Sequence, residues 1–502
     1  MALLIAGAMG SWKRQLHLLH RWLGIGIGLL VLLWFGSGIV MMYVPYPKLS
    51  EQERRAWLPA LDAAQVKVSA WDAWQSLAQP GVPSVVKLNT VAGRPAYHFM
   101  GNGRWSSVWA DTGAALHATE AMARAAAASA APGATALSVG QIDLDQWTFG
   151  PVKMHRPLYR VEADDVAGSV LYVSGRTGEL VRDTTRSERA WNWAGSVIHW
   201  IYFTPLRTHG EPWRQVVMWT SGAAFLLVMA GMVLGIQRIR LRQPYASGRR
   251  SPYRGWQAWH HWLGLGVGTL TLTWLFSGWL SVTPFDWLAS PGVTAKDRLA
   301  FAGGPLNQGD LSVALAPAIR ARPGLLELEW RRVGGKLYFS ALERTGRSLL
   351  SAENGAVLPS IPDKALLLAI RATRPDVPLL AVERLTSGDS YYYSHHADRP
   401  FPVMRAQFML ADETTFYVNP AQGTLVAYAD RNSKWNRWLF NGLHQLDFAA
   451  SLRTRPVWDV MVASLSVLGA MLSATGLVLG WRRLRKRRPK PLRRDQAYIA
   501  SS

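Results

Sequence analysis

The fold is decided by residues 19–46, which read LHRWLGIGIGLLVLLWFGSGIVMMYVPY. This stretch is apolar over the roughly 20 residues that a helix needs to cross a bilayer, and it contains no acidic residue. His20 stands near its N-terminal end, and Gly24 and Gly28 follow on the same helix face. The sequence therefore predicts a membrane-spanning helix with an imidazole above a groove that has no side chains.

The pattern returns roughly 240 residues later, where residues 259–285 read WHHWLGLGVGTLTLTWLFSGWLSVTPF. His260 takes the place of His20, and a slightly larger shift places His199 on His444. Groove glycines occupy matching positions in the two copies: Gly24, Gly28, Gly264 and Gly268. Such glycines also permit close helix packing, and the two interpretations are compatible. We predict a tandem repeat over nearly the whole chain, with two spans per unit returning the chain to its starting side.

The net charge of +22 comes largely from basic residues beside the apolar spans. Lys and Arg precede the first span, fill the segment 238–255 and follow the last span at 482–502. Short flanking segments rich in these residues stay cytoplasmic. Topology therefore explains the charge without a nucleic-acid partner, and both termini are expected in the cytoplasm.

The chain contains no cysteine. It can form no disulfide, hold no iron–sulfur cluster by thiolates and attach no haem covalently through a C-x-x-C-H motif. Any haem would therefore be of the b type, with His or Met as axial ligands.

The sequence divides most of the chain into spans, α+β regions, short aromatic helices and cytoplasmic segments. The spans are expected at 16–44, 213–237, 256–283 and 457–481. The α+β regions are expected at 45–190 and 284–433, on the side of the membrane opposite the termini. Interfacial helices are expected at 191–205 and 435–450, and cytoplasmic segments at 1–15, 238–255 and 482–502. The Ala-rich segment 121–131 is either a helix or a linker, and the sequence leaves both open.

Several ordered motifs resemble the PepSY-associated transmembrane family. They are LHRWLG in the first span and, in the second half, YYYSHHADRPFPVMRAQF, TTFYVNPAQGTL and RWLFNGLHQLDF. Helices followed by paired strands that end in Gly-containing turns also look like PepSY domains. The resemblance covers nearly the full chain. It implies a membrane protein of four transmembrane α-helices in a tandem two-helix repeat, with two α+β PepSY-type periplasmic regions.

Members of that family include iron-regulated proteins of the bacterial inner membrane, among them ferric-siderophore reductases with two b-type haems on four spans. By motif position, the resemblance implies that His20, His260, His199 and His444 are the axial ligands. It implies two haem b groups and a ferric siderophore or other ferric chelate as substrate. The electron donor would be a quinol or a cytoplasmic reductase, since no nicotinamide or flavin fingerprint is visible. His17 and His261 have no matching histidine in the other repeat, so no ligand role is carried onto them.

The repeated histidines also favour haem ligation by their own chemistry. A bis-histidine haem needs one imidazole on each face of the macrocycle. The repeat pairs His20 with His260 on the cytoplasmic side and His199 with His444 on the outer side, although a pairing of His20 with His199 stays open. A single interfacial histidine more often bonds a carbonyl or extends to the headgroups, but ionisable residues kept within two repeated spans indicate function.

A weaker group of candidates precedes a predicted strand of the second outer region. They are Tyr391, Tyr392, His395, His396 and Arg405. Aromatic and cationic side chains could contact an acidic iron chelate, but an aromatic strand packed into the domain core is the favoured interpretation.

Two rival functions remain. One is a non-enzymatic membrane regulator whose PepSY regions bind a protease or another envelope protein, which would contain no haem. The other is a metal-ion transporter that uses the same histidines, and the lack of acidic residues in the spans argues against it.

Overall fold

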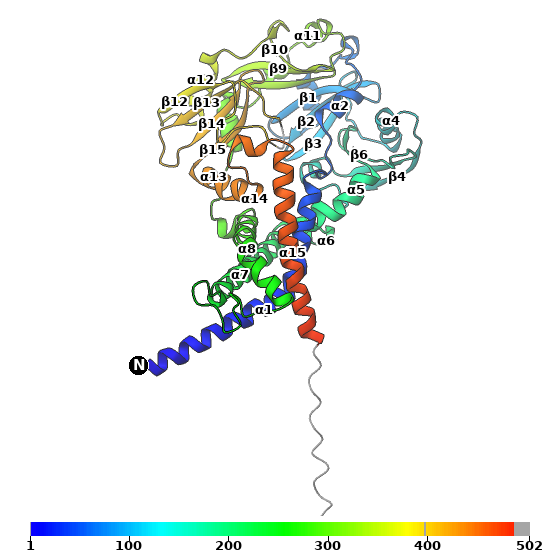
Figure 1. The fold of residues 1–502 in the computed structure, drawn as a ribbon. Helices are drawn as coiled ribbons and strands as arrows, with labels where there is room; N and C mark the ends of the chain where they lie inside the picture. Colours follow the sequence, from blue (N-terminus) through cyan, green and yellow to red (C-terminus); the bar gives the residue numbers. More distant parts are fainter. Residues whose placement is uncertain (1, 396–397, 486–502) are drawn as a thin grey trace, which may run out of the picture. The chain divides into compact units, whose positions relative to one another are not determined.

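The computed structural model describes residues 2–395 and 398–485. The chain forms two compact units, each built from separate stretches of sequence (Figure 1). The helical unit takes residues from the segments 1–43, 194–285 and 439–502, and the sheet unit consists of segments 44–193 and 286–438.

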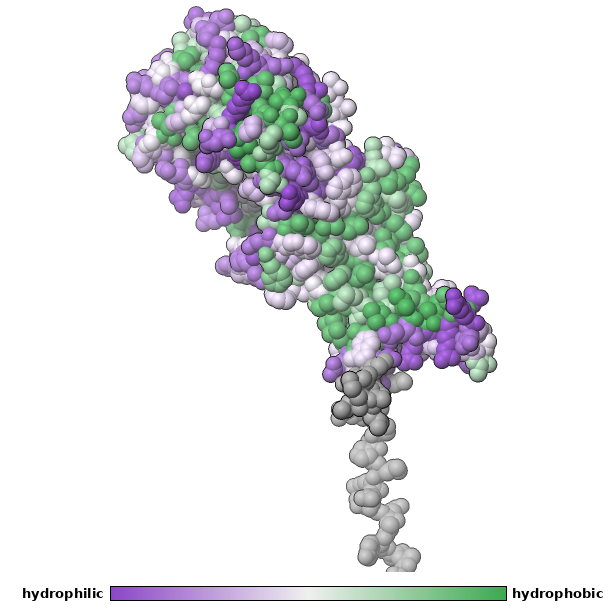
Figure 2. Space-filling view, turned by 90° about the vertical axis from the view of Figure 1, so that its left-hand side faces the viewer, coloured by the Kyte–Doolittle hydropathy of each residue, from purple (hydrophilic) through white to green (hydrophobic). Residues whose placement is uncertain are grey.

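Four long helices make up the core of the helical unit, and the four expected spans lie on them. They are α1 (Ala2–Met41), α7 (Gly210–Arg238), α8 (Trp256–Leu280) and α15 (Val457–Arg485). Among the described residues, these four are long and apolar enough to cross a membrane. Each helix packs against two others, in the order α1, α7, α8, α15 and back to α1. Figure 2 shows hydrophobic side chains on the face of this bundle that it displays, as expected for contact with lipid.

The chain enters α7 and α15 through short, irregular helices. The first set is α5 (Arg186–Asn192), the π-helical turn η3 (Trp193–Val197) and α6 (Thr204–Arg207). The second set is α13 (Arg431–Asn436), the π-helical turn η5 (Arg437–Gly442), α14 (Leu443–Gln445) and η6 (Ala450–Arg453). The sequence predicted one continuous interfacial helix in each place. The structure instead starts each set earlier, because Thr185 and Asp430 form capping boxes at the starts of α5 and α13.

The described residues of the sheet unit form three antiparallel sheets. The seven-stranded sheet has the order β11 (Val357–Leu358), β10 (Gly346–Ser351), β9 (Lys336–Glu343), β8 (Glu327–Val333), β1 (Val85–Val91), β2 (Arg94–Gly101) and β3 (Arg104–Trp109). One four-stranded sheet has the order β4 (Ala136–Ile142), β5 (Leu158–Ala163), β6 (Val170–Ser174) and β7 (Leu180–Thr184). The other has the order β12 (Leu379–Leu385), β13 (Val403–Phe408), β14 (Thr415–Asn419) and β15 (Thr424–Ala429).

The large sheet is shared between the two halves of the chain. Strand β1 pairs with β8, and Leu88 lies opposite Leu328 in the register. Both leucines are fully buried in the largest core cluster. The two α+β regions, expected to be separate, are thus joined through one hydrophobic core.

Helices cover the sheets and close their cores. The Ala-rich segment forms α4 (Glu120–Ala130), capped by Thr119, and packs on β4, β5 and β6, so it is a helix rather than a linker. On the other four-stranded sheet, α12 (Asp363–Thr373) joins the core and also packs against α9 (Ala295–Ala302). The remaining short helices are η1 (Ala63–Gln65), α2 (Glu51–Trp57), α3 (Ala70–Ser76), η2 (Gly150–His155), η4 (Pro284–Asp286), α10 (Gln308–Leu311) and α11 (Ala316–Arg320).

Candidate functional site

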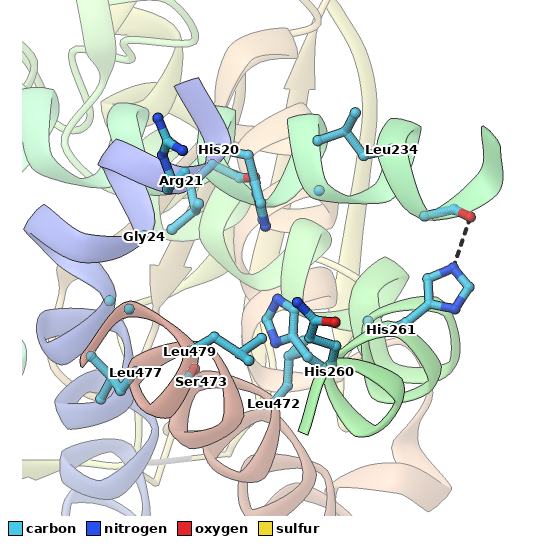
Figure 3. A pocket seen from close by; sticks show the side chains of 18 of the residues that line it. His20, Arg21, Gly24, Leu234, His260, His261, Leu472, Ser473, Leu477 and Leu479 are labelled. Atoms are coloured by element: carbon cyan, nitrogen blue, oxygen red, sulfur yellow. Dashed lines mark hydrogen bonds between the residues drawn. The ribbon is translucent and has the colours of Figure 1, made fainter. Parts of the chain in front are cut away.

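The helical unit contains a cavity of about 780 Å³ between α1, α7, α8 and α15. This volume lies within the range of about 300–1,000 Å³ that is typical of small-molecule and cofactor sites. The wall includes all four glycines that the sequence assigned to a groove: Gly24, Gly28, Gly264 and Gly268. His20 on α1 and His260 on α8 also line the cavity, as Figure 3 shows.

The imidazoles of His20 and His260 point toward one another across this cavity (Figure 3). Their ring centres are 6.1 Å apart, and the ring planes are inclined by 41°. Nδ1 of His20 lies 3.0 Å from the carbonyl oxygen of Leu227, and Nδ1 of His260 lies 3.0 Å from Oγ1 of Thr475. A carbonyl only accepts, so the proton of His20 is on Nδ1 and the lone pair is on Nε2.

A second pair, His199 and His444, is held by the irregular segments that follow η3 and η5. The two ring centres are 6.2 Å apart and the planes are inclined by 72°. Nδ1 of His199 lies 3.1 Å from Oγ of Ser37 on α1, and Nδ1 of His444 lies 3.1 Å from Oγ of Ser277 on α8. Turns of π-helix are frequent at functional sites. The structure therefore brings together the two pairs that the repeat suggested, and places His20 and His199 in different pairs.

Each of the four imidazoles rests against a glycine of a neighbouring helix. A Cβ atom on Gly231 would lie 2.5 Å from Cε1 of His20, and one on Gly476 would lie 3.2 Å from Cε1 of His260. The equivalent approaches in the other pair are 3.6 Å for Gly38 and 3.5 Å for Gly278. The sequence analysis missed these glycines as contacts of histidine, although their matching positions in the two halves were a usable signal.

The ring separations in both pairs fit a haem held by two histidines, and the His20–His260 pair also lines a cavity. Imidazole nitrogen binds transition metals at about 2 Å, so two imidazoles on opposite sides of one ion have ring centres about 6 Å apart. The observed separations are 6.1 and 6.2 Å. The protein engages the Nδ1 atoms, which leaves Nε2 for a metal. Within the described part of the chain, no group of three or more His, Cys, Asp or Glu residues is arranged to hold a metal ion.

The cavity wall is basic at one end. Four of its lining residues are arginines: Arg21, Arg254, Arg482 and Arg483. None of the described residues that line the cavity is Asp or Glu. Guanidinium groups pair well with carboxylates and phosphates, so this end is suited to acidic groups of a ligand, such as the propionates of a haem.

His261 has a structural position beside the cavity. Its side chain is buried, Nδ1 lies 2.9 Å from Oγ of Ser251, and Nε2 lies 3.0 Å from the carbonyl oxygen of Gly235. Both ring nitrogens are therefore engaged, and the histidine ties the last turn of α7 and the end of the α7–α8 loop to the start of α8. This agrees with assigning it no ligand role.

The weaker candidates of the sheet unit have partners within their own domain. Tyr392 is buried and stacks on Tyr417, with ring centres 5.0 Å apart. Arg405 forms ion pairs with Asp389 at 3.0 Å and Glu383 at 2.8 Å. Tyr391 donates its backbone N–H to Asp389, His395 is half-buried, and His396 lies outside the described residues. These contacts favour a role in domain packing.

A buried ionic cluster, which the sequence analysis did not find, joins β1, β8 and the β6–β7 turn. Arg54 pairs with Glu179 at 2.8 Å and also with Glu327, whose side chain is fully buried. Nδ2 of Asn89 donates to both carboxylates, at 2.7 and 3.3 Å, and Nε2 of His98 lies 2.9 Å from Oδ1 of Asn89. Burial alone raises the pKa of Glu179, but attraction to His98 and Arg54 outweighs it and lowers this pKa to about 2.

The fold defines a multi-pass membrane protein whose helical bundle contains a cavity and two pairs of histidines. The chain belongs to the family described as the PepSY-associated TM region, whose model matches residues 17–324. The match begins in α1 and continues through α7 and α8 into the second half of the sheet unit. A search of curated proteins finds no match to this chain.

Proposed function

We propose that the protein is a di-haem b oxidoreductase of the bacterial inner membrane that passes electrons outward to reduce ferric iron in the periplasm, with a ferric siderophore as the favoured substrate. The observation that carries the proposal is that four histidines form two facing pairs. Their ring centres are 6.1 and 6.2 Å apart, and their Nδ1 atoms form hydrogen bonds with the protein. Membership of the family supports the substrate class.

The residues of the helical unit have separate tasks in this proposal. His20 with His260, and His199 with His444, would each hold one haem b, which supplies reversible one-electron chemistry when bound. The glycines provide flat surfaces, and the four arginines of the cavity counter acidic groups. Electrons would come from a quinol or a cytoplasmic reductase. Reduction weakens the hold of hard oxygen ligands on iron, which releases it from the chelate.

The orientation in the membrane follows from charge. The α7–α8 loop and the segment after α15 are rich in arginine, and such short loops stay cytoplasmic. The sheet unit would then be periplasmic. A tandem repeat is supported by the equal strand orders of β4–β7 and β12–β15 and by the equal Ser37–His199 and Ser277–His444 contacts.

The first test is a reduced-minus-oxidised visible spectrum of the detergent-purified protein, with pyridine haemochrome quantitation. We expect sharp α and Soret bands and about two haems per chain. His20→Ala and His444→Ala should each lower this to about one. His209→Ala, at an exposed position in the loop before α7, is the matched control and should retain both.

A colourless protein from haem-replete cells would contradict the proposal. The remaining candidate would then be the regulator that binds a protease or envelope protein. If haem is present, oxidation of the reduced protein by a ferric siderophore, followed in the α band, tests the substrate.

A further inference from the structure

Two serine hydroxyls, one for each histidine, bridge the His199–His444 pair to backbone carbonyl oxygens. Oγ of Ser37 lies 3.2 Å from the carbonyl oxygen of Trp34, and Oγ of Ser277 lies 2.9 Å from that of Trp274. A hydroxyl has one proton, and here it is donated to the carbonyl. Each Oγ can then accept the Nδ1 proton of its histidine. Nδ1 of His444 also lies 3.3 Å from the carbonyl oxygen of Trp274, so a second acceptor favours the same tautomer, which leaves Nε2 free.

In the His20–His260 pair, the hydrogen bonds of the two Nδ1 atoms differ. Nδ1 of His260 donates to Oγ1 of Thr475, which in turn donates to the carbonyl oxygen of Leu472 at 2.7 Å. Nδ1 of His20 donates directly to the carbonyl oxygen of Leu227.

Sequence explains this asymmetry. The shift that places His199 on His444 also places Leu227 on Leu472, but it places Ala230 on Thr475. The surroundings of His260 therefore differ from those of His20 by one hydroxyl group, that of Thr475.

We propose that Ser37, Ser277 and Thr475 are positioning residues that hold three of the four imidazoles in the Nδ1–H form, and that Thr475 tunes the reduction potential of the site between His20 and His260. The inference rests on the proposed haem function, and it adds an account of what sets the reduction potentials of the two haem sites. Donation from Nδ1–H to an acceptor makes the imidazole a more basic ligand, which stabilises the ferric state and lowers the potential. Removal of an acceptor should raise it.

The experiment is a dye-mediated spectroelectrochemical titration of the full-length holoprotein in detergent, with the haem content and the low-temperature EPR spectrum of the oxidised form measured on the same samples. Thr475→Val keeps the volume of the side chain and removes the hydroxyl, so it should shift one of the two midpoint potentials upward. Ser37→Ala and Ser277→Ala should shift the other. Thr475→Ser restores a hydroxyl and should return the wild-type value.

Thr273→Val is the control, because among the described residues Oγ1 of Thr273 donates only to the carbonyl oxygen of Leu270 on its own helix. It should leave both potentials and both EPR signals unchanged. A lowered haem content in Thr475→Val that Thr475→Ser restores also supports a positioning role.

The outcomes separate the two proposals. Unchanged potentials and EPR signals in all the hydroxyl variants, or an equal shift in Thr475→Ser and Thr475→Val, would overturn the inference while the haem function stands. A wild-type protein without haem would overturn both.

Discussion

Small residues shape the histidine sites as much as the histidines do. Each imidazole lies where a neighbouring helix presents only a glycine Cα, and the closest of these approaches is that of Gly231 to His20. A methyl group at that position would overlap Cε1 of the ring. Since α7 and α1 are packed against one another, the ring has to move to make room.

We therefore expect Gly231→Ala to disturb one haem site selectively. Overpacking of this kind costs about 1–3 kcal/mol in a well-packed interior, and the imidazole of His20 would be displaced from its partner. Haem content should fall from about two to about one per chain. Gly26→Ala, where a Cβ would have no neighbour within 4 Å, is the control and should retain both haems.

The histidines and groove glycines could be predicted because the repeat marks them twice. Gly231 and Gly476 were harder to find, because their contacts depend on which helices are neighbours. Thr475 could not be found in this way at all. Its counterpart is Ala230, so a search for residues that the two halves share passes over Thr475, although this residue is what makes the two halves differ.

At the scale of elements, the ionic cluster around Glu327 stabilises the junction between β1, β8 and α2. Glu327 faces Arg54, Lys87 and Arg347, and its side chain has no exposed surface. Removing one partner of a buried ion pair leaves a buried charge without compensation, which costs about 3–5 kcal/mol.

Glu327→Ala should therefore destabilise the sheet unit by about 3–5 kcal/mol. Denaturant unfolding in detergent, followed by tryptophan fluorescence, measures the change. The matched control is Glu353→Ala, which removes an exposed pair with Lys336 and should change stability by less than about 1 kcal/mol. Equal effects of the two substitutions would contradict the assigned role of the cluster.

Acid should weaken the same junction. The pKa of Glu179 is lowered to about 2 from an ordinary value of 4.5, so its ionised form stabilises the folded state above pH 4.5. This contribution is lost as the pH falls from about 4.5 to about 2, and its upper bound is on the order of 3 kcal/mol. We expect the unfolding temperature to fall over this range, and to fall less in Glu179→Gln. An identical fall in both proteins would contradict the assignment.

Strands could be located from alternating apolar residues and Gly-containing turns, but their partners could not. A period of two shows which face of a strand is buried and says nothing of the strand beside it. The pairing of β1 with β8 joins residues far apart in sequence. For the same reason the ionic cluster, whose members come from α2, β1, β8 and the β6–β7 turn, could not be predicted.

At the scale of the whole molecule, the absence of cysteine makes the proposed topology directly testable. Val166 is fully exposed in the sheet unit, and Ser247 is exposed in the α7–α8 loop. In intact spheroplasts, a membrane-impermeant maleimide should label Val166→Cys. Ser247→Cys should react only after the membrane is permeabilised. The reverse pattern would place the sheet unit in the cytoplasm and remove the proposed periplasmic reduction.

The shared seven-stranded sheet also sets a minimum time for the folding of the newly made chain. Lys87 pairs with Glu329, and the roughly 240 residues between them take about 10–50 s to translate at 5–20 residues per second. During that interval two further spans must be inserted while β1 keeps an open edge able to pair with any other strand. The rate of translation, rather than the collapse of the core, therefore determines when the seven-stranded sheet of this protein can be completed.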